Sequence, residues 1–445
     1  MQGLPADVFI RDDQCERFAE YSKRVHHIQW DSNPGVGLPG WNSSFFFQVA
    51  HLLPGSLSFP KLQQLELHEC GPCDVSLNII ISPSLRRLTW IRDDALAPAR
   101  SPLQVAVCQA PLLQHLQIIG GIPWMHTAYI SRFKHLTSLD LSTFYIIADP
   151  LTTRQMYHNM INDLSHMRLV VIRLPSTLRC DHIPPGVTFS HLKSLYSSNS
   201  PATIGAFLDT LSVGRLRTFH SYRSPSFAEF SRSWSMCLDN LRLHCGSSLR
   251  KLYLVARTID DGLSMMDTIR PLLDIHTLED VTLSLFPTAS SDEVQTMASA
   301  WPHLTSFMLG MYPLRTTFPL QGLVHLGRSC PGLITLKVEI VEGLLSLPDL
   351  EMLPTLSHGL QSLILDVPAD TNHVFLARVL DRLFPTLENL SVNSATALPP
   401  LWDDVLQMLK AFRTIRQECR SVSVRNNVGE GAGVLGTQTK GTGID

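Results

Sequence analysis

The feature that most constrains this chain is a short apolar motif that returns along most of its length. Each copy holds leucine, two residues, an apolar residue, one residue and a third apolar residue, as in Leu62, Leu65 and Leu67. The second and third apolar residues are two positions apart, so they point to the same side of an extended strand. The repetition therefore predicts a stack of short strands with one apolar face and one free face.

The motif recurs twelve more times, at spacings of 23 to 33 residues. These copies begin at Leu85, Leu113, Leu136, Met167, Leu192, Leu216, Leu249, Leu278, Leu304, Leu333, Leu360 and Leu387. The copy read as Met167, Val170 and Ile172 is degenerate, and the next two end in Ser197 and Ser221 instead of an apolar residue. The mean period is about 27 residues, which is typical of leucine-rich repeats.

The predicted fold class is α/β, a leucine-rich-repeat solenoid. Spacings of this length leave room for a helix between strands, and parallel strands joined through a helix form right-handed crossovers. We expect a right-handed horseshoe of about 14 parallel strands with convex helices, counting a degenerate first strand at Val25, Ile28 and Trp30. Helical periodicity predicts helices over residues 201–213, 226–241, 290–300 and 372–384.

The ends of the chain differ from the repeats. Residues 1–10 are interpreted as a linker remnant, and residues 11–400 as the solenoid with an N-terminal capping helix over 12–24. An amphipathic helix over 401–420 is expected to cap the last repeat, since open solenoid ends need covering. Residues 421–445 are glycine-rich with few packing side chains, and a disordered tail is predicted there. Local irregularity is expected over residues 167–221, where the motif is weakest.

Composition narrows the classes of partner. The formal net charge is −3, from 36 basic and 39 acidic residues, which does not favour nucleic-acid binding. No apolar run reaches the roughly 18 residues of a membrane helix, and residues 1–20 do not have the pattern of a secretory signal. We therefore expect an intracellular protein, cytoplasmic or nuclear, without nucleic-acid or membrane partners.

Chemical motifs are few. Cys70-Gly-Pro-Cys73 has the letters of a thioredoxin-type redox site, but Cys70 lies eight residues after Leu62, where leucine-rich repeats place Asn or Cys in the turn. Both cysteines are therefore predicted to be structural and reduced. Gly431-x-Gly433-x-x-Gly436 resembles a dinucleotide fingerprint, but no following βα unit fits before the chain ends. No catalytic residue, metal site or cofactor is predicted, and the chain is expected not to be an enzyme.

The free face of the predicted sheet is the candidate binding surface. Positions two, four and six after the first leucine should lie on this concave side. In three neighbouring copies those positions hold Tyr196, His220, Tyr222, Lys251 and Tyr253. Tyrosine is enriched in interface hot spots, and this set is the predicted partner-binding patch. Alternatively, the rings only stack on one another.

Several segments resemble the F-box-type leucine-rich-repeat proteins of mushroom-forming fungi. They are the run from Asp13 to Ile28 and the sequences Phe-Pro-Lys-Leu (59–62), Trp-Pro-His-Leu (301–304) and Phe-Pro-Thr-Leu (384–387). The resemblance spans roughly residues 10–420 and implies substrate recognition for a cullin–RING ubiquitin ligase. Only about ten residues precede the matching helix, so the F-box itself is expected to be absent here and no docking residues are carried over.

Three functions follow as hypotheses. The first is the substrate-recognition repeat domain of an F-box-type ubiquitin-ligase adaptor, which holds an unknown protein on its concave face and reaches the ligase only if an F-box lies upstream. The second is a stand-alone scaffold, inhibitor or sensor without a ligase link. The third is a thiol redox protein that uses Cys70 and Cys73.

Overall fold

The structure is a computed structural model that divides into two compact units, Met1–Phe286 and Pro287–Asp445. It describes residues 12–31, 59–69, 77–92, 101–223, 230–256, 265–284, 288–310, 318–339, 353–356, 358–366, 372–391 and 401–430. Each unit is described by itself below, as unit 1 and unit 2.

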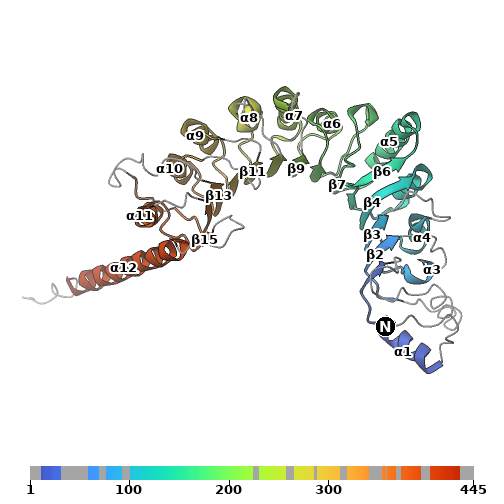
Figure 1. Cartoon of the computed structure of the whole chain (residues 1–445), viewed down its shortest axis with the longest axis horizontal. Coiled ribbons are helices and arrows are strands. Elements are labelled where there is room, and N and C mark those ends of the chain that lie inside the picture. Colours follow the sequence, from blue (N-terminus) through green and yellow to red (C-terminus); the bar gives the residue numbers. More distant parts are fainter. Residues whose placement is uncertain are drawn as a thin grey trace, which may run out of the picture. The chain divides into compact units, whose positions relative to one another are not determined.

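Unit 1 is a parallel sheet with helices on one side (Figure 1). Its strands are β1 (His27–Asp31), β2 (Gln64–Glu69), β3 (Arg87–Arg92), β4 (His115–Pro123), β5 (Ser138–Asp140), β6 (Phe144–Ile147), β7 (Val171–Arg173), β8 (Ser194–Ser197), β9 (Thr218–Arg223), β10 (Lys251–Ala256) and β11 (Asp280–Ser284). Apart from β6, they pair in chain order.

The connections of unit 1 carry the helices found among its described residues. These are α1 (Asp12–Ser22), α3 (Leu77–Ile80), α4 (Pro102–Gln109), the 3₁₀ helix η1 (Trp124–Arg132), α5 (Pro150–Ser165), the 3₁₀ helix η2 (Cys180–His182), α6 (Pro201–Leu208), α7 (Phe230–Cys245) and α8 (Met265–Leu273). Figure 1 shows α4 to α8 on the same side of the sheet, and none of these helices lies on the other side, which we call the open face.

Unit 2 repeats the arrangement with four described strands, β12 (Ser306–Leu309), β13 (Thr335–Glu339), β14 (Ser362–Asp366) and β15 (Asn389–Ser391). Its described helices are α9 (Ser291–Ala300), α10 (Leu320–Ser329), α11 (His373–Leu383) and α12 (Leu401–Glu430). Ser290 caps α9 and forms a capping box with Glu293. The cap lies at the Ser-Ser-Asp-Glu start of the helix predicted over 290–300.

The core consists of the motif residues themselves. Leu88, Leu116 and Leu139 pair in register across β3, β4 and β5, and all three side chains are buried. Leu336, Leu363 and Leu390 pair in the same way across β13, β14 and β15. Every strand predicted from a motif copy is present among the described residues. The α/β leucine-rich-repeat solenoid is therefore confirmed as the fold class.

The copy read from Met167 was wrong by two residues. In the structure Ile172 pairs with Leu139 of β5 and with Leu195 of β8. Leu169, Ile172 and Leu174 are the buried residues, whereas Met167 and Val170 are partly exposed. These buried residues form a complete motif, leucine-x-x-isoleucine-x-leucine, so this copy is not degenerate.

The expected irregularity over 167–221 lies in the connections and not in the strands. Ser197 and Ser221 pair in register, and both are buried within the core positions of β8 and β9. The connection between β7 and β8 holds only the three-residue η2 as a helix. A second departure was not predicted: from Gly120 to Pro123, β4 pairs with β6 in a separate small sheet. Gly120 has φ 96°, and a Cβ there would lie 2.1 Å from the Arg92 carbonyl oxygen.

Hydroxyl side chains tie neighbouring repeats together. The residue just before the first leucine is Ser or Thr in several copies, and its hydroxyl donates to a carbonyl of the preceding copy. Examples are Ser248 to Leu216 (2.7 Å), Thr277 to Leu249 (2.6 Å) and Thr386 to Leu360 (3.2 Å). Each bond satisfies a carbonyl in the turn, so these hydroxyls stabilise the stacking of repeats.

The predicted helices are present with shifted ends. The one expected over 201–213 ends at Leu208, and the one expected over 226–241 is α7, which continues to Cys245. Gly246 follows it, and a Cβ there would lie 2.6 Å from the Arg242 carbonyl oxygen. Only glycine fits there without a shift of the chain. Arg242 and His244 in the last turn favour the helix end through its dipole.

The C-terminal helix begins where predicted and runs further. α12 reaches Glu430, ten residues past the expected end at 420, so the tail predicted as disordered over 421–445 is helical in its first part. Residues 421–428 contain neither Pro nor Gly, so no strong helix breaker precedes Gly429. Residues 431–445 and the linker over 1–10 lie outside the described residues. The remaining domain boundaries stay predictions.

Candidate functional site

The open face of unit 1 carries a continuous line of touching side chains. Its members are the residues four positions after the first leucine in the seven consecutive copies from Leu85 to Leu249, and they lie opposite one another in the strand registers. We call them the lateral row: Thr89, Gln117, Asp140, Arg173, Tyr196, His220 and Tyr253. Position four alternates with the buried positions of each strand, so these side chains point away from the helices.

The first half of the lateral row is joined by hydrogen bonds. The Thr89 hydroxyl lies 3.4 Å from the Gln117 amide oxygen, and the Gln117 amide nitrogen donates to Asp140 Oδ2 at 3.1 Å. Arg173 Nη1 donates to the same Asp140 oxygen at 3.0 Å. Asp140 thus accepts from both sides, and its charge is balanced by the Arg173 guanidinium.

The second half is joined by rings. The Arg173 guanidinium carbon lies 4.8 Å from the centre of the Tyr196 ring, a cation–π contact. Tyr196 and His220 meet edge to face with centroids 5.4 Å apart, and His220 and Tyr253 do the same at 5.2 Å. Edge-to-face geometry matches the positive rim of one ring to the negative face of the next. The three rings therefore hold one another in fixed orientations.

Tyr253 ends the row with a bond to a carboxylate. Its hydroxyl donates to Asp280 Oδ2 on β11, and Asp280 lies two residues before Thr282, the register partner of Tyr253. Burial, followed by this bond, raises the pKa of Tyr253 above the usual range for tyrosine. The hydroxyl is therefore protonated at neutral pH and acts as a donor, not as a base or nucleophile.

His220 is neutral at physiological pH for two reasons. Burial lowers its pKa, and the nearby Arg173 guanidinium lowers it further. A neutral imidazole can sit between two tyrosine rings without the cost of a half-buried charge. The neutral state of His220 therefore favours a stable ring stack.

The structure brings together three of the five predicted patch residues. Tyr196, His220 and Tyr253 contact one another as described. Tyr222 lies two residues beyond His220 on the same face of β9 and is 45% exposed. Lys251 is exposed and pairs in register with Thr218 and Asp280. The rings do stack on one another, as the alternative interpretation held, and the stack also remains partly exposed on the open face.

Sequence reasoning missed the residue that connects the two halves of the row. Arg173 is four positions after Leu169, the same position that Tyr196 holds after Leu192. Because that copy was read from Met167, Arg173 fell at position six instead of position four, out of line with Tyr196, and was overlooked. The signal was present: the six residues Leu169 to Leu174 match the motif in full.

Other chemical groups lie apart from this surface. Cys237, Cys245 and Cys330 are buried, and burial raises the pKa of each thiol to about 12. These thiols are therefore unreactive at neutral pH. Cys70 and Cys73 lie outside the described residues, so their predicted structural role stays a prediction. Within the described ranges, no cluster of three or more metal-ligating side chains occurs.

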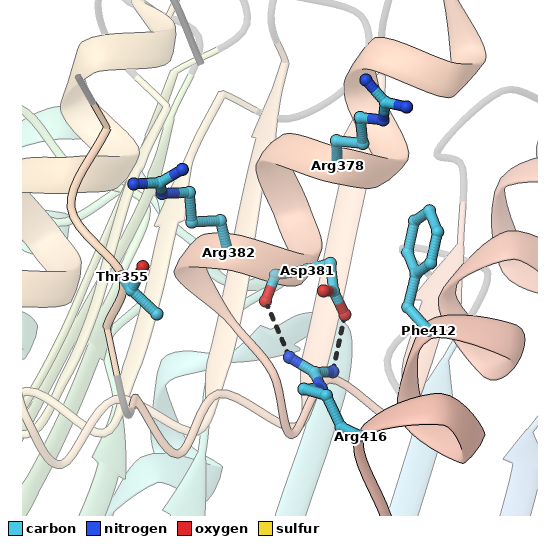
Figure 2. A pocket seen from close by; sticks show the side chains of 6 residues that line it. All are labelled: Thr355, Arg378, Asp381, Arg382, Phe412 and Arg416. Atoms are coloured by element: carbon cyan, nitrogen blue, oxygen red, sulfur yellow. Dashed lines mark hydrogen bonds and ion pairs between the residues drawn. The ribbon is translucent and has the colours of Figure 1, made fainter. Parts of the chain in front are cut away.

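A pocket of about 460 Å³ in unit 2 lies where α12 meets α11 (Figure 2). It is lined by Thr355, Arg378, Asp381, Arg382, Phe412 and Arg416. Arg416 Nη2 donates to Asp381 Oδ1 at 2.6 Å, and its Nη1 donates to the Asp381 carbonyl at 3.3 Å. In Figure 2 Arg378 and Arg382 point away from this pair.

The contacts at this pocket are those of a helix cap. Val405 and Leu409 of α12 are buried, and the Arg416–Asp381 pair ties the same helix to α11. Burial raises the pKa of Asp381, and Arg416 opposes that rise. We interpret this region as the attachment of α12 to the last repeat.

Comparisons with known proteins give no family for this chain. No family model matches the chain, and no curated protein matches it. Among solved structures, the yeast complex of Rad7 and Elc1 matches with 14% identity over 87% of this chain and 92% of that chain, with a TM-score of 0.46.

Two bacterial structures match as well. An internalin of Listeria monocytogenes matches with 13% identity over 80% of this chain and 95% of that chain, with a TM-score of 0.42. A leucine-rich-repeat protein of Leptospira interrogans matches with 14% identity, 88% and 90% coverage, and a TM-score of 0.40. At these identities and TM-scores the matches carry no argument about fold or function. Within the described part of the chain, no helix is both long and apolar enough to span a bilayer.

Proposed function

We propose that this chain is a protein–protein interaction module whose partner binds the open face of unit 1. The observation that carries the proposal is the ring stack of Tyr196, His220 and Tyr253 on the sheet face opposite helices α4 to α8. Faces of parallel sheets are normally covered, so an uncovered one is available for a partner. Rings held by their neighbours lose little conformational entropy on binding, which favours their use as contact residues.

The open face carries charged side chains of both signs beside its aromatic rings. Arg173 is balanced by Asp140, and Asp280 accepts from Tyr253. Lys251 is an exposed cation next to the stack, and Tyr222 adds an exposed ring. A partner with apolar or aromatic side chains flanked by a carboxylate would match this arrangement. No charge of one sign dominates, in line with the expectation of a protein and not a nucleic acid.

The finer proposal is substrate recognition for an F-box-type ubiquitin ligase. Its support is the resemblance of residues 10–420 to the fungal F-box-type repeat proteins, with the motifs quoted above. In this role the open face would hold the protein to be ubiquitylated. The alternative is a scaffold, inhibitor or sensor that uses the same face without a ligase. Both roles are non-enzymatic within this chain and need no cofactor.

The test is affinity capture with variants matched for exposure. The open-face variant carries Tyr222→Ala and Lys251→Ala, which alter exposed side chains outside the ring stack. The control carries Met236→Ala and Leu243→Ala on α7, whose side chains are 67% and 58% exposed on the helical side. We expect proteins captured by the natural chain and by the control to be lost from the open-face variant. Equal capture by all three would contradict the proposal.

The same experiment separates the two roles. Recovery of cullin–RING ligase subunits together with an open-face partner supports the adaptor role. Recovery of the partner alone, from cells that express the natural full-length protein, supports the scaffold. Thiol redox activity would appear instead as insulin reduction that Cys73→Ser abolishes.

A further inference from the structure

The sheet of unit 2 has a face of its own, and the inference drawn from it does not rest on the proposed function. Figure 1 shows α9, α10 and α11 on the same side of β12 to β15, and none of these three helices lies on the other side. We call that other side the unit 2 face. Buried residues alternate with partly or fully exposed ones along each strand, so positions two and four after the first leucine of each copy lie on this face.

Position four of the unit 2 face forms an apolar row with one charge in it. On β12, β13 and β14 the residues at this position are Met308, Lys337 and Ile364, and each pairs in register with the next. All three side chains are half-buried. Neighbouring strands lie about 4.8 Å apart, so the aliphatic stem of Lys337 has an apolar side chain on each side. The ammonium group at the end of this stem is the one charge in the row.

Lys337 has no partner for its charge among the described residues. Its ammonium group makes neither an ion pair nor a hydrogen bond there. Burial lowers the pKa of Lys337, and no acidic group in the described part of the chain opposes this shift. A half-buried ammonium in this position loses part of its hydration and gains no ion pair in return. Arg173 of the lateral row differs, because Asp140 balances its charge.

Position two of the unit 2 face places hydroxyl groups beside this lysine. Ser306, Thr335 and Ser362 pair in register across the same three strands, and within the described residues none of their hydroxyls makes a hydrogen bond. They lie two residues, roughly 6.6 Å along the strand, from position four. A hydroxyl can donate to a carboxylate or to a backbone carbonyl. None of the eight residues at positions two and four of β12 to β15 is acidic, so the face offers donors and one positive charge.

We propose that the unit 2 face binds an acidic segment of a partner protein, in which one Asp or Glu carboxylate lies between apolar side chains. Charge complementarity defines this occupant: the carboxylate meets the ammonium of Lys337, and the apolar side chains cover Met308 and Ile364. The hydroxyls at position two bind the remaining oxygens of the segment. A nucleic acid or a uniformly acidic segment would need a broader basic surface than one lysine provides.

The test is selection of peptides from a random display library on the full natural chain, followed by fluorescence anisotropy with the most enriched peptide. Lys337→Met removes the charge and keeps an unbranched side chain. Lys410→Met, at an exposed lysine of α12, is the matched control. The open-face variant with Tyr222→Ala and Lys251→Ala reports binding to unit 1 instead. Melting temperatures of the unliganded variants verify that each is folded.

We expect an enriched family of peptides with one Asp or Glu between apolar residues. Binding should weaken about tenfold or more in Lys337→Met, and equally when the peptide carboxylate is replaced by an amide, the loss of one charged hydrogen bond. Lys410→Met and the open-face variant should bind like the natural chain, a result that stands even if unit 1 binds no partner.

Three results would overturn the proposal. The first is that no enriched family carries such a carboxylate. The second is that Lys337→Met binds unchanged, or that Lys410→Met or the open-face variant weakens binding as much as Lys337→Met does. The third is a dimer of the natural chain that dissociates in Lys337→Met, because that would assign the unit 2 face to a second copy of the chain.

Discussion

Removing the middle ring of the lateral row should weaken unit 1 by a calculable amount. His220→Ala deletes two edge-to-face contacts, with Tyr196 and with Tyr253. Each such pair contributes about 0.5–1.5 kcal/mol beyond area burial. Because the rings are partly exposed, we expect the lower part of the summed range, about 1–2 kcal/mol. For a domain of this size that corresponds to roughly 2–8 °C in melting temperature.

Urea denaturation measures the loss, and a double-mutant cycle assigns it to the rings. His220→Ala and Tyr253→Ala, alone and combined, should show a coupling free energy of about 0.5 kcal/mol or more, as residues in contact do. Lys251→Ala alters an exposed side chain two residues before Tyr253 on β10. Its free energy of unfolding should stay within about 0.5 kcal/mol of that of the natural chain. Additive losses for His220 and Tyr253 would refute the reasoning, since independent rings cannot form a stack.

Three further outcomes follow from single groups. Ser221→Ala should raise the free energy of unfolding by about 1 kcal/mol, because the buried Ser221 hydroxyl has no hydrogen-bond partner; lower stability in urea would contradict this. Thr277→Val should lower the free energy of unfolding by about 1 kcal/mol, because the hydroxyl that donates to the Leu249 carbonyl is lost. Thr296→Val, at an exposed position of α9, is the control. His220 has a lowered pKa, so the unfolded chain takes up this proton at higher pH than the folded chain does. Stability should therefore fall as pH drops below about 6.5, and His220→Gln should make that fall shallower in pH-dependent melting; an unchanged slope would contradict the assignment.

The repeat fold could be predicted because its signal is redundant. Each copy places its leucines in the same register as its neighbours, so a degenerate copy is held by the copies on both sides. Strands β8 and β9 illustrate this: Ser197 and Ser221 weaken the motif, and yet the two residues still pair in register. The sheet is specified by the leucine positions of many copies, each a weak signal that agrees with the others. The regular spacing of the copies makes these positions visible in the sequence.

Features that depend on a single residue were harder to predict. The frame of β7 rested on choosing Leu169 over Met167, and that choice decided whether Arg173 belonged to the lateral row. The small sheet of β4 and β6 rests on Gly120, whose positive φ is invisible in a pattern of apolar residues. The end of α12 depends on the absence of a stop signal, and amphipathicity alone does not report where a helix ends.

The candidate site was predictable as a face and only in part as a set of contacts. Alternation along each strand identified Tyr196, His220 and Tyr253 as neighbours on one side. It could not show that Arg173 stacks on Tyr196 or that Tyr253 donates to Asp280, because these contacts depend on side-chain rotamers.

The central claim is that a protein partner contacts the open face of unit 1, and site-specific photo-crosslinking tests it most directly. A photoreactive phenylalanine replaces Tyr222 on the open face in one variant and Met236 on the helical side in another, both exposed in the natural chain. After irradiation in cells that express the natural protein, we predict a covalent adduct with a second protein at position 222 and none at position 236. An adduct at position 236 alone, or at neither position, would contradict the claim.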